Sequence, residues 1–147
     1  MAQIRVFLDS SVLLAGVVSE TGASRLVMDL AETGLIKLVI CEQVVVEVDR
    51  NLAEKSFEYL LPLSRKLLLK ISPEKCPDPT DNQIKAAARH IVPKDAPILA
   101  AAQEAQVDCL LTFDRARFTP QVAAQTGLVI QTPGEFIAQL RASDLTD

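Results

Sequence analysis

The sequence predicts an α/β protein, built as a three-layer α/β/α sandwich around a central and mainly parallel sheet. Short apolar runs of strand length alternate with longer segments of helix length, which is the pattern of a parallel sheet covered by helices on both faces. Hydrophobic residues make up 49% of the chain but aromatic residues only 4%, and tryptophan is absent. The core is therefore expected to be aliphatic and rich in alanine, as is usual where helices pack on such a sheet.

The length and the even composition of the chain indicate one domain. The 147 residues suit a single domain of ordinary size, and the sequence contains no repeat or low-complexity tract. The proline-rich piece 73–80 is typical of a loop, because the hydrophobic content is similar on both sides of it. We therefore expect residues 1–147 to form one domain.

Strand and helix signals alternate in the first half of the chain. Two short apolar runs predict strands over 4–8 and 35–40. Ser10 and Ser11 can cap a helix that begins near Val12 and ends before the break at Thr21 and Gly22. Further helices are expected over 24–32, 42–55 and 56–68. The run 67–71, LLLKI, is expected to end in a short strand.

The second half continues the alternation. Apolar runs predict strands over 107–113 and 127–131, and helical spacing predicts helices over 82–91, 95–106 and 133–141. Thr80 or Asp81 can cap the first of these helices, and Pro93 separates it from the second. Pro133 can open the last.

Charge and cysteine content narrow the class of protein. The formal net charge of −4 gives no general attraction for nucleic acid or anionic membranes, so a nucleic-acid partner requires positive charge gathered at one place.

No apolar stretch approaches the length of a membrane span, and Arg5 and Asp9 interrupt the N-terminal apolar run. Cys41, Cys76 and Cys109 form no close pair in sequence and are expected to be reduced, buried thiols. We expect a cytoplasmic protein without membrane contact.

Two carboxylates follow strands, at the sheet edge where such folds bind ligands. Asp9 ends the first strand in VFLDSSVLLAG, and Asp114 follows the third in LLTFDRARF. Because parallel strands end at the same edge, the two side chains can lie side by side. Taken singly, Asp9 is equally well explained as a helix cap and Asp114 as a turn residue.

Two more acids stand on the predicted helices. Asp95 lies on the apolar stripe at the first turn of its helix, so this stripe carries it toward the end of the sheet, although an ordinary N-cap is an alternative. Glu47 lies at the edge of the stripe formed by Val44 and Val48, and its alternative is a solvated surface charge.

A divalent cation would allow these four acids to converge. Clustered carboxylates repel one another, and Mg²⁺ or Mn²⁺ relieves this repulsion because both ions prefer oxygen ligands. Such ions activate water for phosphodiester hydrolysis without a side-chain nucleophile. Basic residues flank the acids, and they either pair locally with neighbouring charges or hold a phosphate backbone. They are Arg50, Lys94, Arg115 and Arg117.

In four places, in order along nearly the whole chain, the sequence resembles the PIN-domain ribonucleases. It begins with a hydrophobic strand, Asp, two small hydroxyl residues and an apolar helix, in VFLDSSVLLAG. A helical Glu follows the second strand in VVVEVDRNL, and an Asp opens an alanine-rich helix in KDAPILAAAQEA. The next strand closes with Thr-x-Asp and a Phe, in CLLTFDRARF.

The resemblance implies a Mg²⁺- or Mn²⁺-dependent endoribonuclease with a small α/β/α fold. Its catalytic acids would be Asp9, Glu47, Asp95 and Asp114, with Asp9, Asp95 and Asp114 holding metal. The hydroxyl groups of Ser10, Ser11 and Thr112 would hold the carboxylates or the water by hydrogen bonds. Many family members are toxins of the VapC type, paired with a small antitoxin, and many form homodimers.

The chain departs from the family pattern at two positions. Ser11 stands where Asn is common, and Ala116 stands where many members carry a further acid. The second departure puts binding of two metal ions in doubt.

Two other functions remain open from the sequence. A PIN-fold domain that has lost turnover would serve as an interaction domain. An Asp-nucleophile phosphotransfer domain would use Asp9. However, a haloacid-dehalogenase-type site requires a second Asp where this chain has Ser11, and a receiver domain requires a Lys where it has Gln131.

Overall fold

Five strands form one fully parallel sheet in the computed structural model, which describes residues 3–146. Their order across the sheet is β3-β2-β1-β4-β5. The bounds are Ile4–Leu8 for β1, Ile36–Ile40 for β2, Glu74–Lys75 for β3, Cys109–Leu111 for β4 and Ile130–Gln131 for β5. The central strand β1 pairs with β2 on one side and with β4 on the other. Residues 1, 2 and 147, which the single-domain prediction includes, lie outside the described residues.

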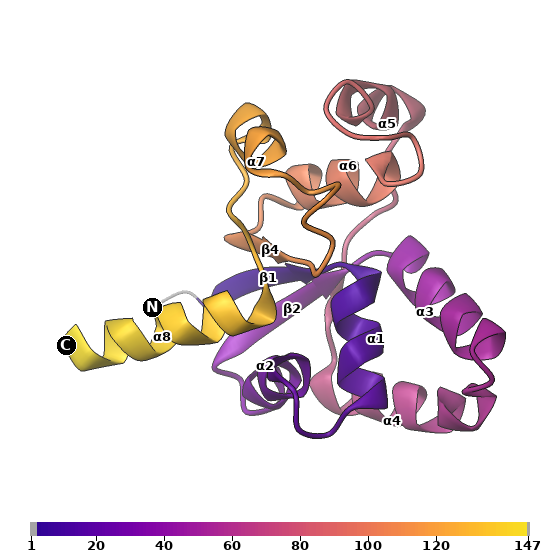
Figure 1. Cartoon of the computed structure of the whole chain (residues 1–147), viewed down its shortest axis with the longest axis vertical. Helices are drawn as coiled ribbons and strands as arrows, with labels where there is room; N and C mark the ends of the chain where they lie inside the picture. The colour runs from indigo at the N-terminus through magenta and orange to yellow at the C-terminus, as the bar shows by residue number, and fades with distance from the viewer. Residues whose placement is uncertain (1–2, 147) are drawn as a thin grey trace.

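Helices cover both faces of this sheet, so the predicted three-layer α/β/α fold is confirmed (Figure 1). One face carries α1 (Ser10–Val18), α2 (Ala23–Glu32), α3 (Glu42–Glu54) and α4 (Leu61–Ile71), with a short 3₁₀ turn at Glu58–Leu60. The other face carries α5 (Asp81–Ala87), α6 (Ala96–Ala105) and α7 (Pro120–Thr126). The last helix, α8 (Pro133–Thr146), packs against α2.

The core is mainly aliphatic and contains buried alanines of α6, as predicted, although Phe7, Phe118 and Phe136 are buried in it as well. Val6, Phe7 and Leu8 of β1 have no exposed surface, and the stripe of α3 at Val44 and Leu52 is equally buried. The three cysteines are buried, and none forms a disulfide among the described residues.

The structure corrects the sequence-based prediction for residues 67–80. The expected strand at the end of 67–71 is wrong, because α4 continues to Ile71, which packs on the core with Leu67 and Leu68 one turn earlier. The expected loop 73–80 contains β3, which pairs with the end of β2. Glu74 in β3 also forms an ion pair with Arg5 of β1. Partners distant in sequence thus order a segment that has little strand propensity of its own.

The helix α7 was not predicted from the sequence. The hydroxyl of Thr119 accepts the amide of Val122 at 3.2 Å, Pro120 follows this cap, and Gly127 ends α7 with φ of 74°. These cap signals are present in the sequence and mark the helix. Its seven residues are too few to show a clear apolar period.

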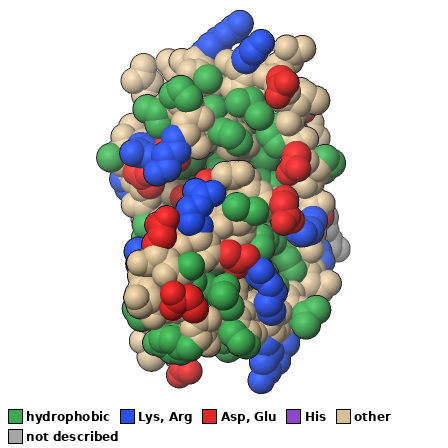
Figure 2. Space-filling view, turned by 90° about the vertical axis from the view of Figure 1, so that its right-hand side faces the viewer, with side chains coloured by type: hydrophobic (Ala, Val, Ile, Leu, Met, Phe, Trp, Pro, Cys, Tyr) green, Lys and Arg blue, Asp and Glu red, His purple; other side chains and the backbone are tan. Residues whose placement is uncertain are grey.

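The described surface mixes charges and apolar side chains. Figure 2 shows basic side chains interspersed with acidic ones on the face that it presents. Within residues 3–146, no single helix is long and apolar enough to cross a membrane. The helices α1 and α2, bent by 92° to one another, together reach the length and hydropathy of a membrane span, but by length and composition alone.

The helix that carries Asp95 depends on buried leucine packing. Leu99 has no exposed surface, so Leu99→Ala is expected to lower the free energy of unfolding by about 2–5 kcal/mol through lost contacts and the cavity left behind. Urea denaturation measures the change. The matched control is Leu69→Ala on α4, where the leucine is 82% exposed and the change is expected to stay within about 0.5 kcal/mol. Equal losses in the two variants would contradict the burial of Leu99.

Candidate active site

Asp9 stands at the junction of the central strand and the first helix. Its amide donates to the carbonyl of Leu111 at 3.0 Å, which extends the β1–β4 pairing by one residue. Its carbonyl accepts the amide of Val12 at 3.0 Å, in the first turn of α1. The strand order reverses between β1 and β4, so Asp9 lies where parallel α/β sheets bind their ligands.

The carboxylate of Asp9 is buried among hydroxyl groups. Its Oδ2 accepts the Thr112 hydroxyl at 2.8 Å and the Ser11 hydroxyl at 3.0 Å, and among the described residues it makes no side-chain cap of α1. Burial raises the pKa of Asp9, the hydrogen bonds of Thr112 and Ser11 oppose this shift, and the nearby charge of Glu47 adds to it. Asp9 thus occupies the N-cap position of α1, as the alternative expected, but in the described part of the chain its side chain makes no cap hydrogen bond.

Thr112 joins two of the predicted acids. Its side chain is fully buried, and its hydroxyl donates to Asp9 while it accepts the amide of Asp114 at 3.0 Å. A second link runs from the amide of Phe113 to the Ser11 hydroxyl at 3.2 Å. The ends of β1 and β4 are thus tied by side chains beyond the last residue pair of the sheet.

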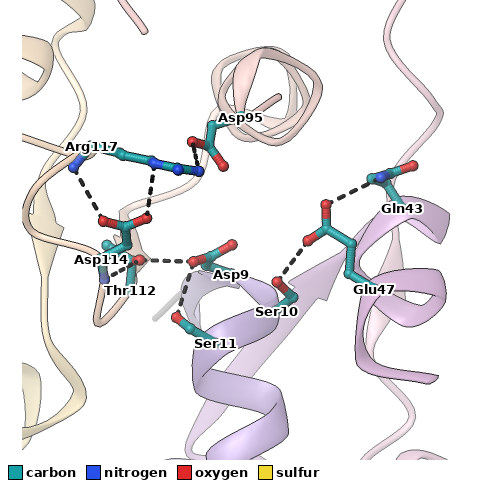
Figure 3. A network of polar contacts seen from close by, with 9 residues as sticks. All are labelled: Asp9, Ser10, Ser11, Gln43, Glu47, Asp95, Thr112, Asp114 and Arg117. Carbon is teal, nitrogen blue, oxygen red and sulfur yellow. Dashed lines mark hydrogen bonds and ion pairs between the residues drawn. The ribbon is translucent and has the colours of Figure 1, made fainter. Parts of the chain in front are cut away.

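Glu47 faces this centre from α3. The Ser10 hydroxyl donates to its Oε2 at 2.7 Å, and the Gln43 side-chain amide donates to its Oε1 at 3.1 Å (Figure 3). The side chain is half-buried, so it is not the solvated surface charge that was the alternative. Gln43 is not among the residues predicted from the sequence, although its position four residues before Glu47 places both on one face of the helix.

Asp95 begins α6 and is joined to Asp114 by an arginine. The Arg117 Nη1 donates to Asp95 Oδ2 at 3.2 Å, while the Arg117 Nε lies 3.9 Å from Asp114 Oδ2 (Figure 3). The Arg117 amide also donates to Asp114 Oδ1 at 3.2 Å. Desolvation raises the pKa of Asp95, Arg117 opposes this shift, and the charge of Asp114 adds to it. Asp95 occupies the N-cap position of α6, but in the described part of the chain its side chain does not cap that helix.

The other three predicted basic residues have different surroundings. Lys94 is exposed beside Asp95, and its charge acts to lower the pKa of that carboxyl. Arg115 is ion-paired with Glu135 at the start of α8. Arg50 is exposed on α3, one turn after Glu47. Among the four predicted basic residues, Arg117 therefore contacts the acids and Lys94 adjoins them.

The donor set suits a hard divalent cation in its chemistry. Asp9, Asp95, Asp114 and Glu47 offer only oxygen atoms, the ligands that Mg²⁺ and Mn²⁺ prefer. Burial raises the pKa of Asp9 and of Asp95, and the charges of Glu47 and Asp114 add to these two shifts. Within residues 3–146, no three His, Cys, Asp or Glu side chains are grouped closely enough to hold a metal ion. In this arrangement, hydroxyl groups and the Arg117 guanidinium hold the carboxylates.

Comparisons with known proteins agree with this arrangement of the fold. A family model described as the PIN domain matches residues 5–116, a range that contains all four acids. The crystal structure of PAE2754 from Pyrobaculum aerophilum is similar to this chain, with a TM-score of 0.64 and 19% sequence identity. The match covers 95% of this chain and 90% of that one, and at this identity it concerns the fold alone. No curated protein compared with the chain matches it.

Replacing Asp9 by Asn is expected to stabilise the metal-free protein at neutral pH. Because burial raises the pKa of Asp9, the folded state keeps its proton to a higher pH than the unfolded state. The contribution of Asp9 to stability is thus greatest below the ordinary carboxyl pKa of about 4, and it is lost as the pH rises through the raised value. Asn carries no charge, so the variant avoids this loss.

Urea unfolding in EDTA measures this effect. The midpoint of Asp9→Asn is expected to lie above that of the wild type at pH 7, and the two are expected to converge in acid. Asp29→Asn, on the exposed side of α2, is the matched control and should show no such pH-dependent difference. A midpoint for Asp9→Asn at or below the wild-type value at pH 7 would contradict the cost of the buried charge.

Proposed function

The chain belongs to the PIN-domain family, and from this premise we propose that it is a metal-dependent endoribonuclease that hydrolyses RNA phosphodiester bonds. Members of the family are generally nucleases and typically use divalent metals. The observation that carries the proposal is the buried Asp9 carboxylate, joined through Thr112 to Asp114 at the reversal point of the sheet. We propose that residues 1–147 act as one nuclease domain.

Asp9, Asp95 and Asp114 are the residues proposed to hold Mg²⁺ or Mn²⁺. When bound, such an ion lowers the pKa of a water molecule and stabilises the leaving oxygen of the phosphodiester. The hydroxyls of Thr112 and Ser11 fix the Asp9 carboxylate through one of its oxygens. Since these donors are already in place, the carboxylate needs little reorganisation to act as a ligand.

Glu47 is proposed to orient the attacking water and to receive its proton. Ser10 and Gln43 bind one carboxylate oxygen each, so the side chain is held from both sides. Its charge lies close enough to raise the pKa of Asp9, which supports a role at the same centre.

The predicted basic residues are proposed to contact RNA phosphates around the acidic centre. Arg50, Lys94, Arg115 and Arg117 would supply local positive charge in a chain whose net charge is −4. Arg115 would exchange its ion pair with Glu135 for a phosphate contact. Arg117 would likewise exchange its carboxylate partners.

The resemblance to the family also suggests a biological role, a location and partners for this chain. By resemblance to VapC-type toxins, we propose a cytoplasmic toxin that is neutralised by a small antitoxin protein and that forms a homodimer. The resemblance alone carries these three points.

One observation favours a second candidate function, that of a PIN-fold interaction domain without turnover. Arg117 joins Asp95 to Asp114 and occupies the place between these two proposed ligands. A domain of this kind would keep its guanidinium in place and would not respond to divalent cations.

Removing the carboxylate charge is expected to abolish metal-dependent RNA cleavage. Asp9→Asn and Asp95→Asn each remove one of the proposed ligands while they retain the shape of the side chain. Purified variants should be incubated with single-stranded RNA and Mn²⁺, and the products separated by gel electrophoresis. Asp29→Asn serves as the charge-matched control and should cleave like the wild type. Undiminished cleavage by purified Asp9→Asn would contradict the proposal.

Divalent cations are expected to stabilise the wild-type protein. An ion that binds only the folded state raises its stability by about 2.7 kcal/mol when the ion concentration is about 100 times Kd. Thermal unfolding should therefore show a Tm that rises with Mn²⁺ concentration for the wild type and stays constant for Asp9→Asn. A wild-type Tm that does not change in millimolar Mn²⁺ would favour the function of an interaction domain instead.

A further inference from the structure

A groove with only basic ionisable residues lies beside the acids. It runs between the turn that joins α5 to α6 and the loop that joins β4 to α7, and its volume is about 430 Å³. The charged or titratable side chains that line it, within the described residues, are Arg89, His90 and Arg117, with no carboxylate among them. The chain as a whole has four more acidic than basic residues, so the basic lining of this groove differs from the average charge of the chain.

Arg117 connects the groove directly to the acidic centre. The same side chain that lines the groove donates to Asp95 and lies beside Asp114. Any ligand phosphate bound by Arg117 therefore lies next to the carboxylates. Ala116, also in the lining, occupies the position where many family members carry a further acid, so it places no negative charge here.

The walls of the groove are ordered and partly apolar. His90 Nδ1 lies 2.9 Å from the Gln125 side-chain oxygen, which holds the ring in place, and the His90 amide donates to Ala87 at 3.0 Å. Val92 is 47% exposed on the same wall. Imidazole and aliphatic surfaces of this kind accept the face of an unstacked base, while arginines accept its phosphate.

We propose that this groove binds one nucleotide of the RNA strand, next to the phosphate that is cleaved. Arg89 and Arg117 hold its phosphate, and the wall of His90 and Val92 receives its base. The volume lies in the ordinary range for small-molecule sites, which suits one nucleotide. The choice of RNA as ligand rests on the proposed function, and the position of the groove adds a binding site outside the four acids.

The test measures RNA binding by full-length protein that does not cleave. A fluorescently labelled, single-stranded RNA is titrated by anisotropy into Asp9→Asn, into Asp9→Asn with Arg89→Gln, and into Asp9→Asn with His90→Ala. Loss of one phosphate contact in the Arg89→Gln protein should weaken binding and reduce the slope of log K against log salt by about 0.7. Loss of stacking in the His90→Ala protein should weaken binding about fivefold or more without changing that slope.

Arg141→Gln on α8, in the same background, is the matched control, because Arg141 is exposed and lies outside the groove. It should leave the salt slope and the affinity at the background values. Unchanged affinity and slope in the Arg89→Gln and His90→Ala proteins would overturn the groove as a nucleotide site.

Cleavage by the protein with wild-type Asp9 is assayed in parallel, so that the two proposals fail separately. Cleavage of RNA together with unaltered binding in both groove variants overturns the groove alone. Weakened binding in those variants together with no cleavage supports the groove and overturns the nuclease function.

Discussion

The site depends on one hydroxyl group, that of Thr112. It donates to the buried carboxylate of Asp9 and accepts the amide of Asp114, so one buried atom joins the two acids that follow β1 and β4. A buried carboxylate without such partners would cost several kcal/mol. With Ser11 as the second donor, the charge of Asp9 is tolerated at the edge of an otherwise apolar core. The hydroxyls lower this cost without neutralising the charge, which leaves Asp9 available to a cation.

Repulsion between carboxylates is the second constraint. Burial raises the pKa of Asp9 and of Asp95. The negative charge of Glu47 adds to the shift of Asp9, and that of Asp114 adds to the shift of Asp95. The Arg117 guanidinium reduces the repulsion between Asp95 and Asp114, because it lies close to both carboxylates. A divalent cation bound here, as proposed, would meet the same electrostatic need as this guanidinium, so its binding would oppose the presence of Arg117 between the two acids. Arg117 thus couples the acidic centre to the basic groove that it also lines.

The proposed RNA substrate has to bind to a chain that is acidic overall. Basic and acidic side chains are mixed over the face shown in Figure 2, and the net charge is −4. Long-range attraction to RNA is therefore weak, and binding has to come from short-range contacts at a few positions. The groove lined by Arg89, His90 and Arg117 is the place proposed for such contacts, and it lies beside the acids.

Local apolar periodicity was enough to predict the strands β1 and β2 and the buried stripe of α3. The four acids could be picked out because each stands at a strand end or on a predicted helix. The sequence also placed Ser10, Ser11 and Thr112 next to strand ends. Tertiary structure decided which hydroxyl meets which carboxylate, since Thr112 and Asp9 are 103 residues apart and meet only when β1 pairs with β4. The same holds for β3, ordered by its pairing with β2, and for Arg117, whose partner Asp95 lies 22 residues away on another element. Contacts of this kind depend on which distant strands become neighbours in the sheet, and local periodicity does not specify that order.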